Sequence, residues 1–141
     1  MQQRLIDTPR WLWSISMRTQ DEIEAAISEE ITRFEQDFMD RLPKDIQVHL
    51  LSDLLVVRLQ GVLTAAEQHL VKSLNHKGRD LLKQVRTHLI ETARPVLEAM
   101  VEKVTGIKVV TLHHDISTRT GEEVLLFTLA HSPDYREAKM K

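Results

Sequence analysis

The chain has 141 residues, 19 basic and 21 acidic side chains, and no cysteine. This length allows one domain with a substantial core, and the composition, 42% hydrophobic and 28% charged, is that of an ordinary soluble globule. The lack of cysteine excludes disulfides, a thiolate nucleophile and cysteine-ligated zinc, and it fits a reducing bacterial cytoplasm. A net charge of −2 argues against a dedicated nucleic-acid binder, which usually carries a basic surplus.

Residues 1–18 are expected to form an N-terminal arm outside the core pattern, with Trp11 and Trp13 close to Pro9. Three interpretations stay open: the arm packs across a bare apolar surface, is disordered, or touches a membrane interface, where tryptophan is favoured. The apolar part of the arm is too short and polar for a signal peptide. No apolar run in the chain approaches the roughly 18 residues that span a bilayer.

A first helix is predicted to begin at Thr19, because Thr19 and Glu22 have the spacing of a capping box. Its buried stripe is expected at Ile23, Ile27, Ile31, Phe34 and Phe38. Its solvent-exposed face is expected to be acidic, with Glu22, Glu24, Glu29, Glu30, Glu35 and Asp37. The helix should end before Pro43, since the residue that precedes a proline disfavours the helical conformation.

A hairpin is predicted next. Apolar residues alternate with polar ones from Ile46 to Leu50, which is the period of a half-buried strand. Ser52-Asp53 is a short polar reversal, and Leu54 to Leu59 is a nearly continuous apolar second strand that ends before Gly61.

A second helical region is predicted from Thr64, which forms another capping-box spacing with Glu67. It should break near Asn75 and continue as a longer helix from Arg79 to about Val104. The expected apolar positions of this helix are Leu82, Val85, Leu89, Ala93, Val96, Met100 and Val104. Pro95 lies inside it, which predicts a kink near Pro95 or two helices placed end to end.

Two further strands are predicted at Ile107–His113 and Glu123–Ala130, followed by a charged tail over residues 132–141. The order is therefore α-β-β-α-β-β within a single domain, residues 19–131. We expect an α+β two-layer sandwich, in which a four-stranded, mainly antiparallel sheet carries helices on one face.

Two of the strands have apolar residues on both faces, which a sheet with one wet face should not have. Leaving the second face in water would sacrifice several kcal/mol at about 25 cal/mol per Å². The arm, a second copy of the chain or another protein should cover it, and we expect a homodimer. The residues expected at this interface are Trp11, Trp13, Leu54, Val56 and Leu126.

The sequence His113-His114-Asp115 is the strongest candidate for ligand binding. On a strand, His113 and Asp115 share one face and His114 points the other way. A metal site would need a third ligand from elsewhere, for which His49 and His131 are the candidates. A titrating histidine pair is the other interpretation of this segment.

A basic stripe is predicted on the long helix, because Arg79, Lys83 and Arg86 fall at i, i+4 and i+7. It would meet an anionic partner or lie in solvent. The four glycines form no nucleotide-binding motif, and no GxSxG frames a serine. We therefore expect neither enzyme activity nor a cofactor.

One block of the sequence resembles the small bacterial MpsC-like family. The resemblance covers residues 19–131 and is carried by Pro43–Leu70, Arg86 and Phe127-Thr128-Leu129, most strongly by Leu63-Thr64, Glu67 and Leu70. The sequence departs from the family at Asp40-Arg41-Leu42, where a Gly-rich turn commonly precedes the proline.

This resemblance implies association with a cation-translocating or bicarbonate-uptake system beside membrane subunits, and it supplies no catalytic residues. The first hypothesis is a cytoplasmic, non-enzymatic accessory domain that forms a homodimer and docks to membrane transport subunits, peripheral to the membrane. The alternative is a small-ligand or metal-binding regulator that uses His113, His114 and Asp115. A weak, salt-sensitive nucleic-acid binder is the third hypothesis.

Overall fold

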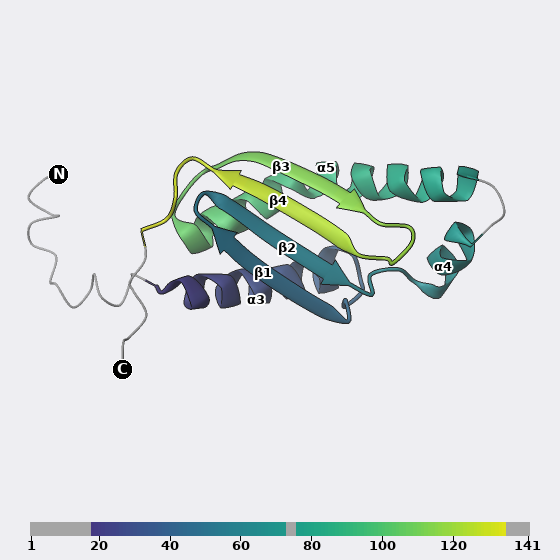
Figure 1. Ribbon diagram of the computed structural model, residues 1–141, viewed down its shortest axis with the longest axis horizontal. Helices are drawn as coiled ribbons and strands as arrows, with labels where there is room; N and C mark the ends of the chain where they lie inside the picture. Colours follow the sequence, from purple (N-terminus) through teal and green to yellow (C-terminus); the bar gives the residue numbers. More distant parts are fainter. Residues whose placement is uncertain (1–17, 73–75, 135–141) are drawn as a thin grey trace, which may run out of the picture.

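A computed structural model describes residues 18–72 and 76–134 and confirms the α+β fold. The predicted order holds, with the second helical region divided into two helices (Figure 1). The elements are α3 (Gln20–Phe38), β1 (Asp45–Leu51), β2 (Leu54–Gln60), α4 (Ala65–Val71), α5 (His76–Thr105), β3 (Val109–Ile116) and β4 (Glu123–Leu129).

The four strands form one antiparallel sheet in the order β1-β2-β4-β3. Each half of the chain contributes a hairpin, and the two hairpins join along β2 and β4. The β1–β2 turn is the predicted Ser52-Asp53 reversal, in which Ser52 takes the left-handed backbone conformation at φ 61°. The register aligns Leu50, Leu55, Phe127 and Leu112 across the sheet on its inner face.

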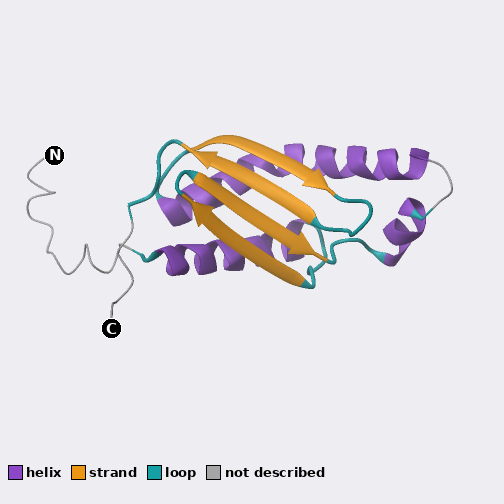
Figure 2. Cartoon of the chain, in the orientation of Figure 1, coloured by secondary structure: helices purple, strands orange, loops and turns teal. Residues whose placement is uncertain are grey.

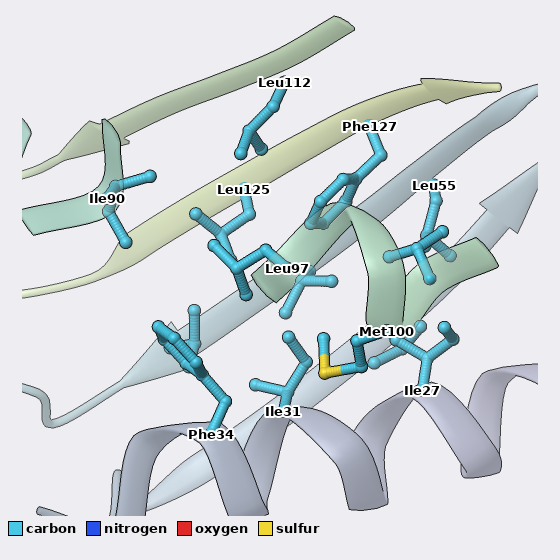
Figure 3. Packing of buried hydrophobic residues seen from close by; sticks show 14 of the residues in the cluster. Ile27, Ile31, Phe34, Leu55, Ile90, Leu97, Met100, Leu112, Leu125 and Phe127 are labelled. Carbon is cyan, nitrogen blue, oxygen red and sulfur yellow. The ribbon is translucent and has the colours of Figure 1, made fainter. Parts of the chain in front are cut away.

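The helices α3 and α5 lie on one face of the sheet, and no described element covers the other face (Figures 1 and 2). The core fills the space between the two layers. Figure 3 shows side chains of both helices meeting those of the strands there: Ile27, Ile31, Phe34, Ile90, Leu97, Met100, Leu55, Leu112, Leu125 and Phe127.

The capping box predicted for α3 is present: Glu22 N donates to Thr19 Oγ1 and Thr19 N donates to Glu22 Oε1. Two predicted positions of this helix are wrong. Glu35, expected on the acidic outer face, is buried, and Phe38, expected in the core, is 40% exposed. Glu35 lies four residues after Ile31. Because an α-helix has 3.6 residues per turn, the two side chains lie on the same inward-facing side of α3.

The long helix α5 is continuous from His76 to Thr105, with Pro95 inside it. The predicted buried stripe is partly wrong, since Val85, Leu89 and Val96 are exposed. The positions that face the core are Gly78, Leu82, Arg86, Ile90, Ala93, Leu97, Met100 and Val101. The side of α5 that contacts β3 and α3 is therefore shifted by about one residue around the helix from the side that the apolar pattern predicted.

Candidate functional site

The uncovered face of the sheet, which we call the open sheet face, has an apolar centre. Leu54, Val56, Val124 and Leu126 point outward from the central strands β2 and β4. These side chains are only half-buried, and their cross-strand neighbours provide the shielding. The sequence predicted this surface at Leu54, Val56 and Leu126, whereas Trp11 and Trp13 lie outside the described residues.

Most edge positions of the open sheet face are polar, and the exposed Leu51 on β1 is an apolar exception. His49 on β1 pairs with Val56, and His113 on β3 pairs with Leu126, so the central cross-strand row runs from polar to apolar and back to polar. Near one end, Arg58 Nε donates to Glu122 Oε2 at 2.6 Å. An apolar centre with a polar rim is the usual anatomy of a protein–protein interface.

The histidine segment divides between the two faces as its alternation predicts. His113 and Asp115 lie on the open sheet face, and His114 points into the core. Lys83 Nζ lies 3.0 Å from Asp115 Oδ1, and this hydrogen bond is the main cause that lowers the pKa of Asp115. Among the described residues, no three His, Asp or Glu side chains come together as a metal site, so neither His49 nor His131 completes one.

The predicted basic stripe does not form one exposed surface. Arg79 is 3.0 Å from the ring of His76, and Lys83 pairs with Asp115. Arg86 is only 4% exposed and belongs to the interior. The i, i+4, i+7 spacing predicted an exposed stripe. Arg86, however, also lies four residues after Leu82, on the side of α5 that faces the core.

A buried charge cluster surrounds Arg86. Its Nη2 donates to Glu67 Oε1 at 2.9 Å and to the Val62 carbonyl oxygen at 3.0 Å. Its Nη1 lies 3.7 Å from Glu123 Oε1. On the far side of Glu123, Oε2 lies 2.6 Å from His114 Nε2. The guanidinium thus links α4, the β2–α4 connection and β4, which fits the fork geometry of arginine.

Glu35 is the third carboxyl of this buried charge cluster. Its pKa is raised from 4.5 to about 8, mainly by burial and also by the negative charge of Glu123, while the positive charge of Arg86 opposes both. Glu35 is therefore mostly protonated at neutral pH, which leaves Arg86 to interact with the carboxylates of Glu67 and Glu123. Arg86 Nε, Glu123 Oε1 and His114 Nδ1 are buried with no hydrogen-bond partner.

A cavity of about 140 Å³ lies beside this cluster, between Glu35, Glu67, Arg86 and Arg41. Thr64, Val62 and Met39 also line this cavity. The cluster contributes to the stability of the fold, because removing one partner of a buried pair leaves an uncompensated charge. Sequence reasoning missed Glu123, although its alternation with Leu125 and Phe127 placed it on the inner face.

A second exposed apolar surface lies on α5. Leu81, Val85, Leu89 and Val96 recur every four or seven residues on its outer side. Val96 also lines a groove of about 240 Å³ with Phe34 and Phe38 of α3, whose rings stack with centroids 5.1 Å apart. The predicted core positions Val85, Leu89 and Val96 thus belong to a helical surface available for packing.

These features define a small α+β domain with an open-faced antiparallel sheet, a buried ionic cluster and exposed apolar surfaces. The chain belongs to the MpsC family: the family model described as "Na+-translocating membrane potential-generating system (MpsC)" matches residues 19–131. It is 36% identical over 114 residues to "Uncharacterized protein YbcI" of Bacillus subtilis (strain 168), a match that covers 81% of this chain and 90% of that protein. No solved structure matches the chain significantly. In residues 18–72 and 76–134, none of the helices has both the length and the apolar character to cross a bilayer.

Proposed function

We propose that this chain is a non-enzymatic accessory domain that forms a homodimer through its open sheet face and docks to subunits of a membrane transport system. The observation that carries the dimer is the row of half-buried apolar side chains on a sheet face that no described element covers. A second copy fits this surface, because the same apolar centre and polar rim are then present on both sides.

The size of the face indicates that more than the strands takes part. Four strands of about seven residues present roughly 450 Å² in projection, from the usual spacing and rise of strands. A stable interface buries about 800 Å² on each partner. The apolar arm, with Trp11 and Trp13, is the part of the chain proposed to supply the rest, since residue 18 enters the domain beside the sheet edge, where Gln20 Nε2 donates to the Leu50 carbonyl oxygen.

The role beside a membrane rests on the family description, which names a Na⁺-translocating, membrane potential-generating system. A domain without a spanning helix in its described part would serve such a system from the cytoplasmic side, held by contact with membrane subunits. The outer apolar side of α5 is a second surface that such a contact could use.

The substitution Val56→Glu tests the dimer. It places a charge at the centre of the open sheet face, where burial against a second copy would cost several kcal/mol. We expect light scattering to give the dimer mass for the parent and the monomer mass for the variant. Thr87→Glu, exposed on the solvent side of α5, is the matched control and should leave the dimer intact.

An unchanged mass for Val56→Glu, in a variant whose circular dichroism matches that of the parent, would refute the dimer through this face. If the parent itself is a monomer but a membrane fraction captures it through Val56, the occupant of the face is a partner subunit instead of a second copy.

A further inference from the structure

Four basic side chains converge at the end of the sheet opposite the β1–β2 turn. Arg41, Lys44, Lys72 and Arg119 line one cavity of about 330 Å³, which we call the basic pocket. They come from three places in the chain: Arg41 and Lys44 from the α3–β1 connection, Lys72 from the end of α4 and Arg119 from the β3–β4 loop. This convergence is absent from the sequence pattern, in which Lys72 and Arg119 are far from each other and from the Arg41–Lys44 segment.

The backbone around the basic pocket is built to hold these side chains. Gly61 has φ 67°, and a Cβ atom there would lie 2.6 Å from Lys44 Cγ, so the glycine lets the lysine stem lie against the chain. The β3–β4 loop is tied by Ser117, whose Oγ accepts from the backbone N–H groups of Arg119 and Thr120. The loop therefore presents Arg119 from a fixed turn.

The basic pocket gathers positive charge, and Arg41 also borders the smaller cavity lined by Glu35 and Glu67. The residues that line the basic pocket include no carboxylate, and none of the four cations forms a salt bridge within the described part of the chain. In addition, Arg41 Nε is buried without a hydrogen-bond partner, while Nη2 of the same side chain makes only a long bond of 3.4 Å to the Gly61 carbonyl oxygen. Four like charges around one cavity repel each other, and a bound anion would remove this repulsion.

We propose that the basic pocket binds a phosphate-bearing ligand. Guanidinium and ammonium groups that converge on one point are the side chains that bind phosphate oxygens, and the hydroxyls of Thr118 and Thr120 add neutral donors. The volume lies near the lower end of the roughly 300–1,000 Å³ of small-molecule sites. The ligand is either a free phosphate compound or the phosphate headgroup of a lipid.

The site is independent of the proposed dimer, because its residues lie at one end of the sheet and not on the open sheet face. The Val56→Glu variant should therefore bind the same ligand as the parent. The test uses the full chain and two probes: inorganic pyrophosphate in calorimetry, and sedimentation with vesicles of phosphatidylcholine with or without phosphatidic acid.

We expect Lys44→Gln and Arg119→Gln each to weaken binding about tenfold, the loss that corresponds to one charge-assisted hydrogen bond. Added salt should weaken the parent's binding. Lys108→Gln is the matched control, since it removes one exposed charge at the opposite end of the sheet. All three changes lie on exposed side chains, so the fold should persist, which circular dichroism checks.

Pyrophosphate binding that falls in the two pocket variants supports a free phosphate ligand. Binding only to the vesicles with phosphatidic acid, with the same loss, supports a lipid headgroup. Absence of binding in both assays, or an equal loss in Lys108→Gln and the pocket variants, would overturn the proposal.

Discussion

Glu35 shows how one buried side chain makes the stability of this fold depend on pH. Its carboxyl lies beside Arg86 and Glu123 in the interior, where its pKa is about 8. In the unfolded chain the same carboxyl titrates near 4.5. Between these values the native state holds one more proton than the unfolded state, so the free energy of unfolding falls as the pH rises from 4.5 to 8.

The substitution Glu35→Gln should remove this contribution, because glutamine stays neutral at every pH. We expect the stability of the variant relative to the parent to rise by roughly 2–4 kcal/mol between pH 5 and pH 8. Urea denaturation at a series of pH values measures this difference. Glu29→Gln, exposed on the same helix, is the control and should follow the parent. Parallel curves for Glu35→Gln and the parent would contradict the buried titration.

The interior charges were also where sequence reasoning was least successful. Arg86 and Glu35 occupy buried registers of their helices, yet charge alone favoured assigning them to solvent. The spacing from Leu82 to Arg86 and from Ile31 to Glu35 was the available signal. The spacing could not predict that Glu35 and Arg86 lie close to Glu123. That proximity depends on how helices from both halves of the chain pack on the sheet.

At the scale of elements, local signals predicted most of the fold. The two capping boxes, the alternation of β1 and the turn at Ser52-Asp53 act between near neighbours, and the structure confirms them. The rotation of α5 could not be predicted from its own pattern, because that helix has apolar residues on both its inner and its outer side. Only packing against β3 and α3 decides which side is buried.

The two capping boxes allow a matched prediction. Thr19→Ala should cost about 1 kcal/mol of stability, the usual value for an N-cap. Thr64→Ala should cost more, because Glu67 Oε1 accepts from both Thr64 N and Arg86 Nη2, so the loss of the box also frees the partner of a buried cation. Chemical denaturation of both variants measures the two costs. Equal costs would show that α4 is not coupled to the buried charge cluster.

At the scale of the whole molecule, the resemblance and the order of elements identified the family and the layered fold. The charges of the basic pocket could not be predicted, because they approach one another only when the loops at one end of the sheet close together. The predicted stripe at Arg79, Lys83 and Arg86 had the right chemistry for an anion but the wrong residues, since two of these side chains already pair with carboxylates.

The proposed interface has a spectroscopic consequence for the whole molecule. Trp11 and Trp13 are the only tryptophans of the chain, so tryptophan fluorescence, excited selectively over Tyr135, reports on the arm alone. If the arm joins the dimer interface, dilution and Val56→Glu should both shift the emission to longer wavelength and increase quenching by acrylamide. Emission that stays constant while the mass falls from dimer to monomer would separate the arm from the interface.

The chain enters and leaves the described domain at the same end of the sheet. Gln20 contacts the Leu50 carbonyl at 2.9 Å, and Leu129 N donates to the Asp53 carbonyl at 2.8 Å, so both ends of the described chain lie beside the β1–β2 turn (Figure 1). A tether attached at either terminus would therefore hold the domain by one pole and leave the basic pocket, at the opposite pole, facing outward. For the same reason, joining the two ends by a short linker and opening the chain elsewhere should give a circular permutant with an intact sheet.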